Sequence, residues 1–190
     1  MTRRPPPRSE PQQIAAEMVE ELPFRRPWDI DEFTAAVGLR TGKPITVEPL
    51  PASLQDEITG LWVPDPHINR IYVTTRGDMS YQEHIRCHEL AHVVLAHAGR
   101  DELDADSYRA QLSRIAPNLP AAFLDQLGPA RVCFAARASY LSELEQTAEW
   151  MATLIQARAD TMRGNVYLDG HDTSSYAIAE RLLNVLGWKS

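Results

Sequence analysis

Cysteine is scarce in this sequence of 190 residues, which contains only Cys87 and Cys133. Two cysteines are too few for the disulfide framework that stabilises many small secreted proteins. Long apolar runs are also missing, since no stretch reaches the ~18 residues of a membrane helix and the opening MTRRPPPRSEP leads into no apolar signal core. We therefore expect a reduced, cytoplasmic protein with no membrane partner.

Positive charge is in deficit as well. The sequence has 19 Lys and Arg residues against 26 Asp and Glu residues, which gives a formal net charge of -7 at pH 7. An acidic surface repels phosphate backbones, and no helix-turn-helix pattern is evident. We therefore expect no direct nucleic-acid partner, and a DNA-binding regulator is the least favoured class of function.

The chain divides into an arm and one domain. Residues 1–11 hold four prolines and three arginines without periodic apolar residues, which predicts a disordered arm. The whole sequence is 44% hydrophobic, so residues 12–190 can bury the core of one domain, and no internal repeat divides them.

The apolar spacing predicts an α+β fold with a small β-sheet packed against a helical bundle. Strands are expected over 43–50 and in a hairpin of 58–63 with 69–75. A central helix is expected over 81–98, with Ser80 and Glu83 as a capping box and Gly99 as its C-cap. Other helices are expected from Gln12 to Pro23, from Asp29 to Gly38, and over 101–116, 120–127, 130–138, 141–159 and 174–186.

The central helix contains the pattern H-E-x-x-H as His88, Glu89 and His92. Histidines four residues apart lie on one helical face, about 6 Å apart along the axis, so both imidazoles can bind one metal ion. Glu89 is rotated away from that pair, in a position to take a proton from water beside the metal. His84 is about 12 Å along the axis from His92, too far to share the ion, and Cys87 is expected to pack in the core.

A catalytic zinc site needs a third protein ligand. In the helix over 141–159, Glu145 falls on a stripe that is otherwise apolar, whereas Glu143 falls off the stripe and is expected in solvent. Burying a carboxylate is costly unless a cation compensates it, so Glu145 is the predicted third ligand. The small Ala148 and Ala152 on the same stripe would let this helix approach the motif helix closely.

Together these two motifs resemble the ImmA/IrrE-type metallopeptidases, over residues 20–155. That family carries H-E-[LM]-[GA]-H followed by Glu-x-x-Ala-Asn-x-Phe-Ala, and the counterparts here are His88 to His92, then Glu145, Ala148, Glu149, Met151 and Ala152. Glu149 stands in place of the family's Asn, and the Pro that usually closes the second motif is absent. The chain is similar to a short, stand-alone member.

This resemblance implies a zincin-like fold and a single-zinc endopeptidase, with zinc, or alternatively manganese, held by His88, His92 and Glu145. It also implies a protein substrate, often a helix-turn-helix transcriptional regulator in mobile-element control, toxin–antitoxin-like pairs or stress responses. Glu89 would be the general base. Among the residues of this sequence, Tyr140, His171 and Tyr176 could each donate to the oxyanion or serve a structural role, and the sequence does not choose among them. The rival hypothesis is a non-catalytic zinc protein that binds such a regulator, but it gives Glu89 no role.

Overall fold

The computed structural model describes residues 9–99 and 143–163, and this part of the chain is α+β. Its secondary structure consists of α1 (Glu10–Glu20), α2 (Ile30–Thr41), β1 (Ile45–Pro49), a short 3-10 helix (Ala52–Leu54), β2 (Gly60–Pro64), β3 (Asn69–Val73), α3 (Met79–His97) and α6 (Glu143–Asp160). The helices predicted over 101–116, 120–127, 130–138 and 174–186 lie outside the described residues. No described helix is long and apolar enough to cross a membrane.

The sheet has three strands in the order β1-β3-β2. β2 and β3 form the predicted antiparallel hairpin, in which Trp62 lies opposite Ile71, and β1 adds to the other side of β3 in parallel. The indole Nε1 of Trp62 donates to Oδ1 of Asn69 at 3.1 Å, which satisfies two buried polar groups within the hairpin. The first four residues of β2 are buried, so this strand belongs to the interior.

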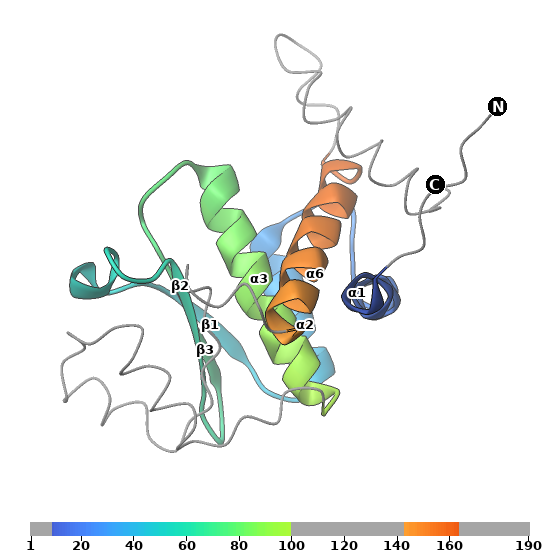
Figure 1. Cartoon of the computed structure of the whole chain (residues 1–190), viewed down its shortest axis with the longest axis horizontal. Helices are drawn as coiled ribbons and strands as arrows, with labels where there is room; N and C mark the ends of the chain where they lie inside the picture. The colour runs from blue at the N-terminus through green and yellow to red at the C-terminus, as the bar shows by residue number, and fades with distance from the viewer. Residues whose placement is uncertain (1–8, 100–142, 164–190) are drawn as a thin grey trace, which may run out of the picture.

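Helix α3 lies at the centre of the described fold, with the sheet on one side and α6 on the other (Figure 1). Every residue from Cys87 to Leu95 is buried, so the middle of this helix is enclosed on all sides. A helix enclosed in this way is normally apolar all round. Its two histidines and one glutamate are therefore an exception that the surrounding structure must compensate.

Helix α6 packs along α3, and α1 packs against α6 in turn (Figure 1). The predicted apolar stripe is confirmed, since Ala148, Ala152, Ile155 and Ala159 are all buried. Three of these are alanines, whose small side chains permit close approach of the helix axes. That approach brings the start of α6 up to the middle of α3.

Among the predicted boundaries that differ from the observed ones, α1 ends at Glu20 rather than at Pro23, and three others have a clear physical reason. Glu10 and Pro11 belong to α1 rather than to an arm, because proline is tolerated in the first turn, where its missing N–H has no helical partner; residues 1–8 of that arm lie outside the described residues. Helix α2 continues past Gly38 to Thr41 and ends at Gly42, whose φ of 77° is left-handed.

The third difference concerns the start of α3, where the predicted capping box of Ser80 and Glu83 is wrong. The N-cap is Asp78, whose side-chain Oδ1 accepts from the backbone N–H of Tyr81 at 2.8 Å. Asp78 precedes the helix and is free to turn back on its first amides, whereas Ser80 already lies within the first turn. At the other end, Gly99 has a φ of 69° directly after the C-cap Ala98, a conformation that favours glycine.

We predict that Asp78→Ala lowers the free energy of unfolding by about 1 kcal/mol, because the substitution removes the N-cap of the central helix. Ser80→Ala is the matched control and should change it by less than about 0.5 kcal/mol, since Ser80 is exposed in the first turn. Urea denaturation of the two variants measures both values. Equal losses would show that Asp78 is not the cap that matters.

Candidate metal centre

The two motif histidines lie on the face of α3 that meets α6. His88 and His92 are 4% and 0% exposed, and their Nε2 atoms are 3.1 Å apart. The helix places them one turn apart, and the buried Leu90, Ala91 and Val93 around them hold this part of α3 within the core. Both imidazoles thus direct a nitrogen at the same point.

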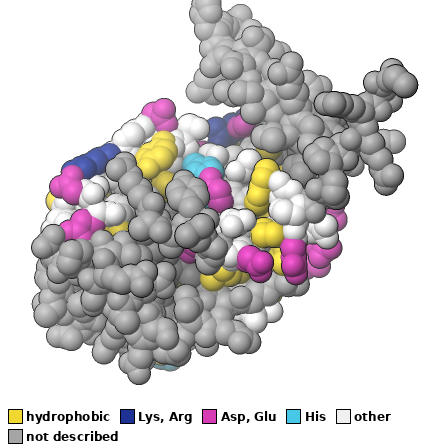
Figure 2. Space-filling model, viewed as in Figure 1, with side chains coloured by type: hydrophobic (Ala, Val, Ile, Leu, Met, Phe, Trp, Pro, Cys, Tyr) yellow, Lys and Arg dark blue, Asp and Glu magenta, His cyan; other side chains and the backbone are white. Residues whose placement is uncertain are grey.

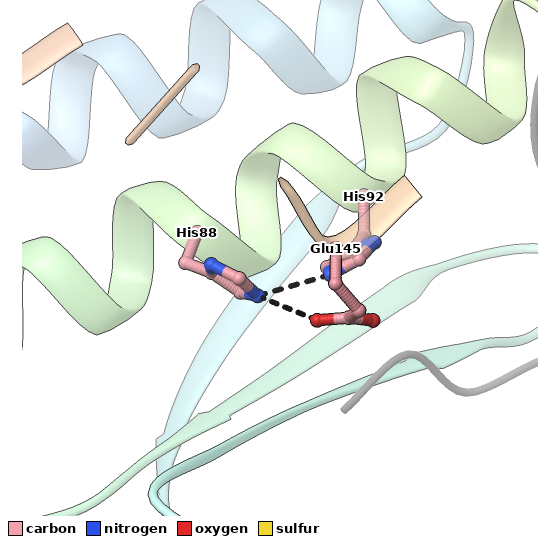
Figure 3. Close-up of side chains that lie close together, drawn as sticks. All are labelled: His88, His92 and Glu145. Atoms are coloured by element: carbon pink, nitrogen blue, oxygen red, sulfur yellow. Dashed lines mark hydrogen bonds and ion pairs between the residues drawn. The ribbon is translucent and has the colours of Figure 1, made fainter. Parts of the chain in front are cut away.

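Glu145 reaches that point from the first turn of α6 (Figure 3). Its Oε2 lies 3.4 Å from Nε2 of His88, and its Oε1 lies 3.6 Å from Nε2 of His92. Donor atoms that share one zinc ion tetrahedrally, at 2.0–2.1 Å each, lie about 3.3 Å from one another. The three side chains, whose donor atoms all lie within 4.8 Å, therefore form a cluster that could hold a metal ion.

Glu89 occupies a different side of α3, against the sheet. Its side chain is 0% exposed, and neither carboxylate oxygen has a hydrogen-bond partner among the described residues. A Cβ built on Gly60, the first residue of β2, would come within 2.5 Å of Oε1 of Glu89. A side chain at that position would force the carboxylate or Ile85 to move, so the glycine leaves room for the Glu89 carboxyl, which lies buried one residue along from the first histidine.

Sequence reasoning identified Glu149 only as a departure from the resembling motif and gave it no role. In the structure its Oε2 lies 3.2 Å from Nδ1 of His88 and its Oε1 lies 3.1 Å from Nε2 of His84. The available signal was spacing, because Glu149 follows Glu145 by four residues and His84 precedes His88 by four. Two i, i+4 series on packed helices can pair, but only the packing shows which members meet.

The other candidates take the places predicted for them, where the structure describes them. His84 is 23% exposed in its side chain and lies outside the three-residue cluster. Cys87 is buried in the core, which raises the pKa of its thiol, and Glu143 is exposed. Tyr140, His171 and Tyr176 lie outside the described residues.

Charges in the cluster are strongly coupled. Burial disfavours protonation of His88, but the hydrogen bonds to Glu145 and Glu149 outweigh it and raise the pKa of His88 to about 10. Burial likewise opposes ionisation of Glu145, yet its hydrogen bonds with His88 and His92 lower its pKa to about 2. The carboxylates therefore stabilise a positive charge at the point where the three donors meet, and a metal cation would replace the proton there.

Glu89 shows the opposite behaviour. Burial raises the pKa of Glu89 to about 8, although the nearby His88 and the backbone N–H of Trp62, which faces the carboxyl without the geometry of a normal hydrogen bond, act to lower it. In the metal-free protein the carboxyl therefore keeps its proton at neutral pH. A buried carboxyl with a raised pKa, near a cluster that could hold a metal ion, is a candidate functional group.

We predict a pH-dependent effect of Glu89→Gln on the stability of chelator-treated protein. Between pH 4.5 and 8 the folded state holds a proton on Glu89 that the unfolded state releases, so rising pH destabilises the wild type, by at most about 1.4 kcal/mol per pH unit. Glutamine has no such proton. The stability of the variant relative to the wild type should therefore increase from pH 5 to pH 8 in urea denaturation. If the variant and the wild type differ in stability by the same amount at both pH values, Glu89 does not have a raised pKa in the folded protein.

Comparison of this chain with protein-family models, with curated proteins and with solved structures found no match. Its function must therefore be argued from the geometry of the cluster itself.

Proposed function

We propose that the chain is a zinc-dependent peptidase in which His88, His92 and Glu145 bind the metal and Glu89 is the general base. One observation supports this proposal above all others. Three donor atoms converge at the spacing of a single ion, and Glu89, a buried carboxyl whose oxygens have no hydrogen-bond partner among the described residues, follows the first of these residues in the sequence. A purely structural ion would need the three donors but would give the fourth group no role.

The donor set favours zinc. Two imidazoles and one carboxylate are a catalytic zinc set that leaves a coordination position open, and manganese is the alternative because it also accepts nitrogen and oxygen ligands. When bound, zinc supplies Lewis acidity that polarises a peptide carbonyl and makes water nucleophilic at neutral pH. The protein residues supply the rest of the chemistry.

Glu89 would accept the proton of the attacking water at a carboxylate oxygen and pass it to the leaving amine. Its burial makes the carboxylate a stronger base than an exposed one, and Gly60 leaves space for it beside β2. His88 and His92 would bind the ion from α3, and Glu145 would bind it from α6. These roles match the H-E-x-x-H chemistry of zinc hydrolases.

We also propose that this arrangement is zincin-like, with the sheet on one side of the motif helix and the third ligand on a later helix. The two motifs resemble those of ImmA/IrrE-type metallopeptidases, and on that resemblance we propose a helix-turn-helix regulator as the substrate. Peptide cleavage would inactivate the regulator and release the genes that it represses.

We predict that wild-type protein binds one zinc ion per chain. Glu145→Ala should weaken binding steeply, because it removes one of three ligands, whereas Glu143→Ala should not, because Glu143 is exposed in the same helical turn. Elemental analysis and chelator competition measure stoichiometry and affinity. A wild type that takes up no zinc would overturn the proposal, and a larger effect of Glu143→Ala would mean that the wrong carboxylate has been assigned.

We predict that Glu89→Gln retains zinc but lowers peptide cleavage by about 10²–10⁴-fold, because the amide cannot act as a base. The assay incubates purified protein with helix-turn-helix regulators, beginning with any encoded beside its gene, and follows fragments by mass spectrometry. If the wild type and the variant both bind a regulator and both leave it intact, the chain is the non-catalytic regulator instead.

A further inference from the structure

The contact between α3 and α6 contains an alternating series of histidines and glutamates. Glu145 lies between His88 and His92, and Glu149 lies between His84 and His88, with the distances given above. Because α3 residues with rising numbers meet α6 residues with falling numbers, the two helices run antiparallel and the two i, i+4 series interleave. His88 is the only one of these histidines that contacts both carboxylates.

We propose that Glu149 and His84 are positioning residues that hold the His88 ring with its Nε2 toward the metal. This inference rests on the proposed metal centre. Nδ1 of His88 donates to Oε2 of Glu149, which leaves Nε2 as the nitrogen that faces Glu145 and His92. A carboxylate that accepts from the second nitrogen of a ligating histidine fixes both its tautomer and its orientation.

Glu149 requires a second partner to do this, because its side chain is 48% exposed and would otherwise extend into water. His84 provides that partner through Nε2. The other ring nitrogen of His84 donates to Oε1 of Gln156 at 2.7 Å, and Nε2 of Gln156 donates to the backbone oxygen of Ser80 at 3.1 Å. This chain of hydrogen bonds anchors the exposed carboxylate to the backbone of α3.

The hydrogen-bonded series that contains Glu149 and His84 lies between α3 and α6 near the protein surface, since both side chains are partly exposed. Figure 2 shows histidine surface next to acidic surface on this face of the molecule. Glu149 and His84 contribute no donor to the cluster itself, so their effect on the metal must pass through His88. A substitution at either position therefore tests orientation without removing a ligand.

Zinc affinity, measured by competition with a chromophoric chelator, tests the proposal. Glu149→Ala should weaken zinc binding by about 10–100-fold, as loss of a carboxylate behind a ligating histidine typically does. Glu149→Gln should weaken it less, because the amide oxygen can still accept from His88 without the charge. His84→Ala should weaken binding in wild type but add little in the Glu149→Ala background, because both residues act through one contact.

Two matched controls separate positioning from charge and from general damage. Glu143→Ala removes a carboxylate from the same helix, and His97→Ala removes an exposed histidine from α3; both should leave zinc affinity unchanged. In the zinc-loaded protein, NMR should show the Nδ1 proton of His88 protected from exchange in the wild type and lost in Glu149→Ala.

The outcomes distinguish this inference from the proposed function. If wild-type protein binds no zinc, the metal centre itself is wrong. If wild type binds zinc and Glu149→Ala binds it equally well, the metal centre stands and the positioning role fails. Equal weakening by Glu143→Ala and Glu149→Ala would also overturn the positioning role, because it would show that general negative charge attracts the ion.

Discussion

The structure depends on the enclosure of ionisable groups within α3. His88, Glu89 and His92 lie in a stretch of helix that is buried on every side. Burying such groups in charged form without compensation costs several kcal/mol, so each is either paired with opposite charge or a cation, or held neutral as Glu89 is. Glu145 meets that requirement for the histidines, because the packing of α6 on α3 brings its carboxylate oxygens to 3.4 Å from Nε2 of His88 and 3.6 Å from Nε2 of His92.

The buried ionisable groups on the two sides of α3 have different surroundings. Toward α6, histidines and carboxylates pair with one another, which stabilises positive charge and lowers the pKa of Glu145 to about 2. Toward the sheet, Glu89 is given space by Gly60 but no hydrogen-bond partner among the described residues. One helix thus separates a cluster suited to a cation from a carboxyl group whose pKa is raised. Under the proposed function, the cluster would hold the metal ion and Glu89 would act as the base.

Small residues make this arrangement possible where α3 meets α6 and where α3 meets β2. Alanines on α6 let its first turn bring Glu145 within reach of two imidazoles, and a glycine at the start of β2 leaves room for Glu89. In both places a larger side chain would displace a functional group, since interiors are densely packed. The residues that shape the site are therefore not those that would perform the chemistry.

The sequence alone determined the features that depend on short-range spacing. Two histidines four residues apart must share a helical face, the β-branched runs at β2 and β3 must pair through a short connection, and Glu145 stands out as a charge on an apolar stripe. It did not determine the cap of α3, because Ser80 and Asp78 both have suitable side chains and only the backbone at the helix start decides between them. Nor did it assign a role to Glu149 or Gly60. Their importance comes from which residues of α6 and β2 come to lie against α3, and that is set by the packing of elements distant in the chain.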